Sequence, residues 1–256
     1  MSSIKIRFLG TGTSTGVPQI GCNCRVCRSV DDKDKRLRTS AIISIKDCNI
    51  LIDCGPDFRT QILNCGSPDL SGVLLTHTHY DHVGGIDDLR PYCNKIKNFP
   101  IYCRQDVAQD LRARLPYCFV ENPYPGVPIF KIHEIGSESF YIDKIKIEPL
   151  KIFHHKLEIL GFKIGNMAYI TDAKTIPTET IDKIKNIDTL VINALRIDEH
   201  LSHMSLSQAL EIIKIINPRV SYLIHLSHDM GLHSDVEKLL PQDIDIAYDG
   251  LEVLVK

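Results

Sequence analysis

The sequence has no apolar run long enough to cross a membrane, no signal-like segment and almost no excess charge of either sign. A membrane-spanning helix needs about 20 consecutive apolar residues, so we expect no membrane partner. The formal net charge of -2 at pH 7 gives no overall attraction to nucleic acid, and we expect no broad nucleic-acid binding. Without the apolar core of a secretory signal the expected location is the cytoplasm. There the nine cysteines would be thiols or metal ligands rather than disulfides.

The chain also lacks a linker. No stretch rich in proline, glycine and serine, no low-complexity tract and no block of charge divides its 256 residues. With 43% hydrophobic residues it can bury a sizeable core, and its length lies near the upper size of one domain. We therefore expect a single domain over residues 1–256.

The densest group of potential metal ligands lies in residues 76–82, directly after the apolar run 72–75. In an extended segment, side chains two residues apart point the same way, so His77 and His79 can reach one ion together. Asp81 and His82 follow where the chain turns into what looks like a helix, and this turn aims them at a second point. Imidazole and carboxylate are ligands that zinc, manganese and iron accept at hydrolytic sites. The segment predicts two metal ions side by side, rather than a histidine-rich surface loop.

A second potential site lies in residues 21–28, where Cys22, Cys24 and Cys27 have the spacing Cys-x-Cys-x-x-Cys. This spacing is typical of a tetrahedral zinc site that lacks one ligand. The loop has little apolar content, so a structural zinc would supply its folding energy. Three free thiols are the alternative. Redox use is less favoured, because nothing here resembles a thioredoxin βαβ unit.

The pattern His-x-His-x-Asp-His after an apolar strand resembles the metallo-β-lactamase superfamily. The resemblance implies an α/β (α+β) fold, a four-layer αβ/βα sandwich with the metals at one edge between two sheets. It implies further ligands at strand ends: Asp172 as the carboxylate that bridges both ions, His225 as the last ligand, and one histidine of a neighbouring pair. We assign that ligand to His155 rather than His154. The superfamily's Leu-Ile-Asp-x-Gly aspartate, here Asp53, is implied to orient the metal-binding loop without binding a metal.

Three features together narrow the resemblance: Gly-Thr-Gly near the start, the three cysteines, and His-x-x-His at the last motif. They resemble the cyclic phosphodiesterases of phosphonate catabolism (PhnP-like), although a paralogous family linked to pyrroloquinoline quinone biosynthesis carries similar cysteines. His228, three residues after His225, can point away from the catalytic ions and is the natural fourth ligand of the cysteine site. The resemblance implies manganese or zinc at the catalytic pair and one structural zinc at the cysteines.

The implied reaction opens a cyclic ribose or nucleotide phosphodiester, a small anionic substrate. A hydroxide activated by two metals and held by Asp172, with Asp81 beside it, would attack phosphorus. His203 matches the position of the relatives' proposed general acid, which would protonate the leaving alkoxide. The sequence does not fix the oligomeric state, and a homodimer is one candidate.

Other functions stay open at this point. A thioesterase of the glyoxalase type would add a C-terminal helical domain, whereas this chain ends in a strand pattern. A lactone hydrolase, a transfer-RNA processing nuclease and a non-catalytic metal-bearing carrier module are further alternatives. The complete ligand set favours an enzyme, because a binding protein has no use for a bridging carboxylate and an open metal position.

Overall fold

The computed structural model describes residues 3–120, 122 and 124–256; residues 1, 2, 121 and 123 of the expected domain lie outside the described residues. The described strands form two mixed sheets of seven strands each. The first has the order β14-β1-β2-β3-β4-β5-β6, with the bounds β1 Ile4–Gly10, β2 Ser40–Ile45, β3 Cys48–Ile52, β4 Gly72–Leu74, β5 Phe99–Cys103, β6 Phe130–Glu134 and β14 Glu252–Val255. The second has the order β13-β12-β11-β10-β9-β8-β7, with the bounds β7 Phe140–Ile142, β8 Ile145–His154, β9 Leu157–Ile164, β10 Met167–Tyr169, β11 Thr189–Asn193, β12 Val220–Ile224 and β13 Ile244–Ile246.

The two sheets pack face to face because each presents apolar side chains to the other. In β1, Ile4, Ile6 and Phe8 face the space between the sheets, whereas the side chains between them are partly exposed. Phe162 of β9 and Tyr169 of β10 are fully buried in the same cluster. This cluster is the central core of the sandwich.

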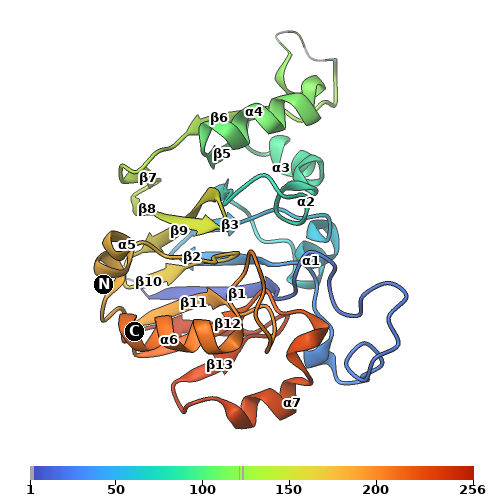
Figure 1. Cartoon of the computed structure of the whole chain (residues 1–256). Helices are drawn as coiled ribbons and strands as arrows, with labels where there is room; N and C mark the ends of the chain where they lie inside the picture. Colours follow the sequence, from blue (N-terminus) through green and yellow to red (C-terminus); the bar gives the residue numbers. More distant parts are fainter. Residues whose placement is uncertain (1–2, 121, 123) are drawn as a thin grey trace.

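Helices cover the outer face of each sheet. They are α1 Phe58–Asn64, α2 Tyr80–Val83, α3 Arg90–Cys93, α4 Gln105–Arg114, α5 Thr178–Ile184, α6 Leu206–Ile216 and α7 His233–Val236, with short 3₁₀ helices at Asp32–Asp34, Ile86–Leu89, Pro116–Phe119, His228–Met230 and Glu237–Leu239. The apolar side chains of α1 and α4 share a cluster with β3, β4 and β5, and those of α5 and α6 share one with β8, β10 and β11. The layers therefore run helices, sheet, sheet, helices (Figure 1), which confirms the predicted four-layer sandwich. Among the described helices, none combines the length and apolarity needed to cross a membrane.

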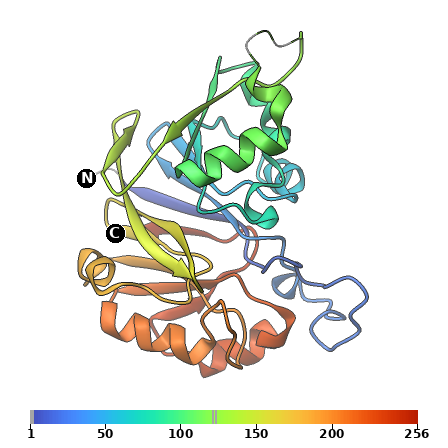
Figure 2. The ribbon, with the colours of Figure 1, turned by 45° about the horizontal axis from the view of Figure 1, so that its top comes forward.

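Both sheets change from antiparallel to parallel pairing part of the way across. In the first sheet, β3 to β6 are parallel, and in the second, β10 to β13 are parallel. Parallel strands end at the same edge of a sheet, and ligand sites of α/β folds lie outside such carboxyl ends. The segments after β3, β4, β10 and β12 meet at this edge. Residues 11–39 join β1 to β2. The ends of this connection are buried at Thr13 and Thr39, whereas its middle part, with the cysteines, projects from the sandwich (Figures 1 and 2).

Candidate metal centre

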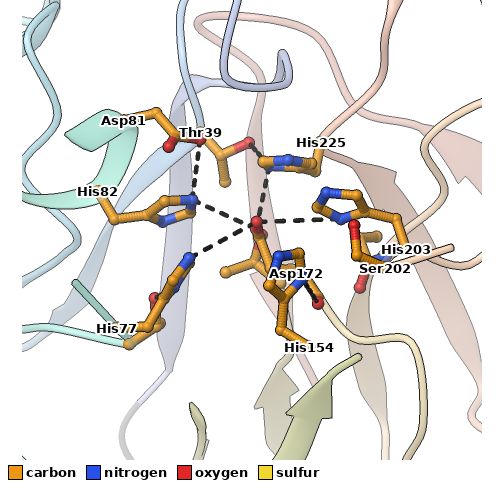
Figure 3. A network of polar contacts seen from close by, with 12 residues as sticks. Thr39, His77, Asp81, His82, His154, Asp172, Ser202, His203 and His225 are labelled. Carbon is orange, nitrogen blue, oxygen red and sulfur yellow. Dashed lines mark hydrogen bonds and ion pairs between the residues drawn. The ribbon is translucent and has the colours of Figure 1, made fainter. Parts of the chain in front are cut away.

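Side chains from six separate segments meet at the edge of the two sheets (Figure 3). They belong to the segments after β4, β10, β11 and β12, to the helix α2, and to the end of β8. The residues are His77, His79, Asp81, His82, His154, Asp172, His203 and His225. The structure therefore brings together every residue that was predicted to bind the two catalytic ions, except His155.

Asp172 lies at the middle of this group. Its Oδ1 is 3.3 Å from Nε2 of His82 and 3.1 Å from Nδ1 of His225. Its Oδ2 lies on the other side, 3.8 Å from Nε2 of His77 and 3.9 Å from Nδ1 of His203. One carboxylate oxygen thus faces each of two groups of potential ligands, which is the arrangement of a carboxylate that bridges two ions.

The buried nitrogens at this centre fit a metal. Among the described residues, Nε2 of His77 and Nε2 of His82 are buried and make no hydrogen bond, although buried polar groups nearly always have a partner. Both are within 4 Å of the Asp172 carboxylate. Imidazole nitrogens and carboxylate oxygens converge in three sets that share Asp172: one with His77 and His79, one with Asp81, His82 and His225, and one with His154 and His203. Zinc, manganese and iron accept such donors.

The electrostatics of the centre also favour cations. Burial alone would raise the pKa of Asp172, but the neighbouring charges of His225 and His82 hold it well below its usual value. Burial alone would lower the pKa of His82, but the carboxylates of Asp172, Asp81 and Asp53 raise it well above its usual value. Carboxylates that stay ionised and make a positive charge favourable at His82 suit the binding of a divalent ion.

Asp53, directly after β3, supports the metal-binding loop from behind. Its Oδ1 accepts a hydrogen bond from the Thr76 backbone N–H (2.8 Å), and its Oδ2 accepts from the Thr76 hydroxyl (2.9 Å) and from Nδ1 of His82 (2.6 Å). A proton on Nδ1 of His82 leaves the Nε2 lone pair free to face the centre. Asp53 therefore has the orienting position that the resemblance implied. The adjacent turn approaches α2 closely: a Cβ on Gly55 would lie 2.0 Å from the backbone oxygen of Asp81, so only glycine fits.

Two threonines that the sequence reasoning missed contact the His225 ring. Thr13 Oγ1 lies 3.2 Å from Nε2, and Thr39 Oγ1 lies 3.2 Å from Nδ1 and donates to the Gly12 backbone oxygen. The two hydroxyl groups therefore flank the ring, one beside each nitrogen. No sequence pattern singled out either threonine, because each contact joins residues far apart in the chain.

The structure places His154 in the centre rather than the predicted His155. β8 continues through His154, whose Nδ1–H donates to the backbone oxygen of Asp172 (2.8 Å) and whose ring lies 5.0 Å from the His79 ring. His155 begins the turn into β9 with a left-handed φ of 54°, and its side chain is exposed. Among the described residues it belongs to no group that could hold a metal.

His203 approaches the centre from the segment between β11 and α6. Its ring stacks on that of His225 at 5.0 Å and lies 4.6 Å from that of His154. Its side chain is 12% exposed, and its Nδ1 is buried without a hydrogen-bond partner among the described residues. Burial lowers the pKa of His203 to about 3, although the Asp172 carboxylate opposes the shift.

The cysteine loop forms a separate group of four donors. The sulfur atoms of Cys22, Cys24 and Cys27 and a ring nitrogen of His228 lie within 4.8 Å of one another. His228 Nδ1 is 3.4 Å from the sulfur atoms of both Cys22 and Cys24. The Cys27 backbone N–H and the His228 side chain lower the pKa of the Cys24 thiol to about 6. A Cys₃His set of this size fits tetrahedral zinc.

Comparison with known proteins finds one shared family and fold, with relatives of different named activities. A family model described as "Beta-lactamase superfamily domain" matches residues 48–226. A Porphyromonas gingivalis protein named octanoyltransferase is 49% identical over 252 residues; the match covers 97% of this chain but 51% of that protein, so the chain spans about half its length. A crystal structure described as a new diphosphatase from the PhnP family has a TM-score of 0.92 and 33% identity, covering 98% of this chain and 97% of that one. Zinc-bound PqqB from Methylobacterium extorquens shares the fold, with a TM-score of 0.78 and 17% identity. This match covers 97% of this chain and 99% of that one.

Proposed function

The chain belongs to the metallo-β-lactamase superfamily and has the fold of its metal-dependent hydrolases, and from this premise we propose that it hydrolyses cyclic phosphodiesters of a ribose or nucleotide. The observation that carries the proposal is the Asp172 carboxylate, with one oxygen toward each of two ligand groups. Two ions bound there would lower the pKa of an attacking water and neutralise charge on the phosphoryl oxygens.

The described side chains divide naturally between two zinc or manganese ions. One ion would be held by His77, His79 and His154. The other ion would be held by Asp81, His82 and His225, and Asp172 would contact both ions. The solvent-exposed position of His79, next to the exposed Tyr80, leaves this side of the centre open to a substrate. The remaining side chains are buried, which keeps their geometry fixed and excludes bulk water.

His203 is proposed to donate the proton that the leaving alkoxide needs. Its Nδ1 faces the carboxylate of Asp172 at 3.9 Å and has no other partner among the described residues. Because burial lowers its pKa to about 3, the ring is neutral in the free protein near pH 7. A phosphate anion beside the ring would favour the imidazolium form and raise that pKa. Substrate binding would thus shift the ring toward its proton-donating form.

The cysteine group is proposed to hold a structural zinc. Only a small apolar cluster around Val17, Val26 and Cys27 packs under this projecting loop. Four protein donors fill a tetrahedral zinc completely and leave no position for a substrate. The zinc would therefore stabilise the loop rather than take part in hydrolysis.

The names of the relatives define the competing substrates. The PhnP-family structure is described as a diphosphatase, and the Porphyromonas gingivalis protein as an octanoyltransferase. A phosphoanhydride is attacked at phosphorus as a cyclic diester is, whereas acyl chemistry would require attack at carbon. Purified protein loaded with manganese or zinc should therefore be assayed on cyclic and linear phosphodiesters, diphosphates, thioesters and lactones. Faster turnover of a thioester or lactone than of every phosphate ester would refute the proposal, and anion binding without turnover would indicate a carrier.

The acid role of His203 has its own test, based on the leaving group. A ribose alkoxide gains from protonation, whereas a nitrophenolate leaves without help. His203→Ala should lower the hydrolysis of a cyclic nucleotide by ~10²–10⁴-fold, with a much smaller loss on a nitrophenyl diester. His200→Ala is the matched control, because the His200 ring lies 5.2 Å from the His203 ring. This variant should show no such difference between the two substrates. Equal losses of His203→Ala on both substrates would mean that His203 only positions the phosphate.

A further inference from the structure

The segment that carries His203 has no regular structure of its own. Residues 194–205, between β11 and α6, contain neither helix nor strand. Backbone hydrogen bonds close its base, from the Leu195 N–H to the Met204 oxygen (2.9 Å) and from the Met204 N–H to the Ala173 oxygen (3.1 Å). The position of the segment beyond that base must therefore depend on side chains.

The Lys174 ammonium, which comes from the chain after β10, contacts this segment. Its Nζ donates to the backbone oxygens of His200 (2.7 Å) and His203 (3.3 Å), and to Oε1 of Gln208 (2.9 Å). An ammonium group has three N–H donors and no acceptor. The three acceptors around Lys174 match those donors one for one.

The partners of Lys174 connect it to fixed parts of the fold. Its backbone N–H donates to the Phe153 oxygen (2.7 Å), next to His154, and Asp172 lies two residues before it. Oε1 of Gln208 also accepts from the Ser205 N–H, within the capping box that begins α6. The lysine therefore joins the segment that carries the central carboxylate to the C-terminal half of the His203 segment and to the start of α6.

We propose that Lys174 is a positioning residue, whose ammonium holds the His203 ring against the Asp172 carboxylate without itself contacting the substrate. This inference rests on the proposed function, because it assigns Lys174 to the proton-donating step. Displacing a catalytic group by about 1 Å can cost ~10²-fold in rate. Loss of the three bonds should thus imitate the loss of His203, and it should spare the metals.

The decisive variant is Lys174→Met, whose unbranched side chain reaches as far as Cε of the lysine and lacks the three donors. On a cyclic nucleotide the rate should fall on the order of 10²-fold, and on a nitrophenyl diester much less. In a His203→Ala background the same change should have almost no further effect, because two residues that act through one contact are not additive. An equal loss in both backgrounds would overturn the proposal. Lys214→Met, at an exposed position of α6, is the control for removing one positive charge.

Two measurements test the positioning role independently of turnover. Amide hydrogen exchange of residues 196–204 should accelerate in Lys174→Met but not in Lys214→Met, and metal content should equal that of the unmodified protein. Unchanged exchange, or loss of metal, would overturn the proposal. His203→Ala could instead lower the rate equally on both substrates, which would refute the acid role of His203. The exchange measurement would still decide whether Lys174 holds the segment, so failure of the proposed function and failure of this inference are distinguishable.

Discussion

Asp53→Asn is expected to weaken metal binding at His82 while leaving the fold intact. The asparagine can keep Oδ1 toward the Thr76 backbone N–H, 2.8 Å away in the present structure. Its Nδ2 then stands where Oδ2 accepts the His82 Nδ1–H at 2.6 Å. An N–H donor at that point favours the tautomer with the proton on Nε2 of His82, the nitrogen that faces Asp172. Because the Nε2 lone pair is then occupied, His82 binds a metal poorly.

The size of the effect follows from the bonds that change. Replacing a group that orients a metal-binding histidine typically lowers metal affinity by ~10–100-fold, which corresponds to about 1.4–2.7 kcal/mol. Asp53→Ala would in addition leave the three buried donors without partners, at about 1–3 kcal/mol each. The alanine variant should therefore lose stability as well as metal, whereas the asparagine variant should lose mainly metal.

The metal affinity is measured by calorimetry, as zinc or manganese is titrated into the metal-stripped protein. The stability is measured by thermal unfolding of the same variants. Asp57→Asn is the matched control, because its carboxylate bonds to the Arg38 backbone and guanidinium and contacts no histidine of the centre. That variant should bind metal normally. The reasoning is refuted if Asp53→Asn binds both ions as tightly as the unmodified protein.

Three further predictions concern other parts of the chain. His154→Ala should lower both bound catalytic metal and turnover, whereas His155→Ala should change neither; elemental analysis beside the hydrolysis assay tests the pair, and a metal loss confined to His155→Ala would contradict it. Cys24→Ser should release one tightly held zinc and lower thermal stability more than turnover, and the absence of zinc beyond the catalytic pair in the unmodified protein would exclude the site. The hydrogen bond from Arg219 lowers the pKa of Asp188 from 3.8 to about 2. A carboxylate with a depressed pKa stabilises the fold above its unfolded pKa. Because the Arg219 side chain is half exposed and water screens the pair, Asp188→Asn should cost on the order of 1 kcal/mol at pH 7. In urea unfolding this difference should shrink between about pH 4 and pH 2, and a constant difference over that range would contradict it.

Local spacing was enough to predict the groups of ligands that lie close together in the chain. His77 and His79 share a side of an extended segment, and Cys22, Cys24 and Cys27 lie on one short loop. These relations follow from backbone geometry over a few residues. The four-layer sandwich came from the resemblance of the histidine motif to a family rather than from periodicity.

Only the tertiary structure decided the choices that depend on contacts across the fold. The choice between His154 and His155 depends on β8 ending at His154, because the next residue turns outward with a positive φ. The contact of Thr39 with His225 joins residues 186 positions apart, and the bonds of Lys174 reach the loop after the next strand. Such contacts form when two sheets and their loops pack together. The physical reason is that periodicity is a property of neighbouring residues, whereas the partner of a long polar side chain is set by whichever segment the fold brings beside it.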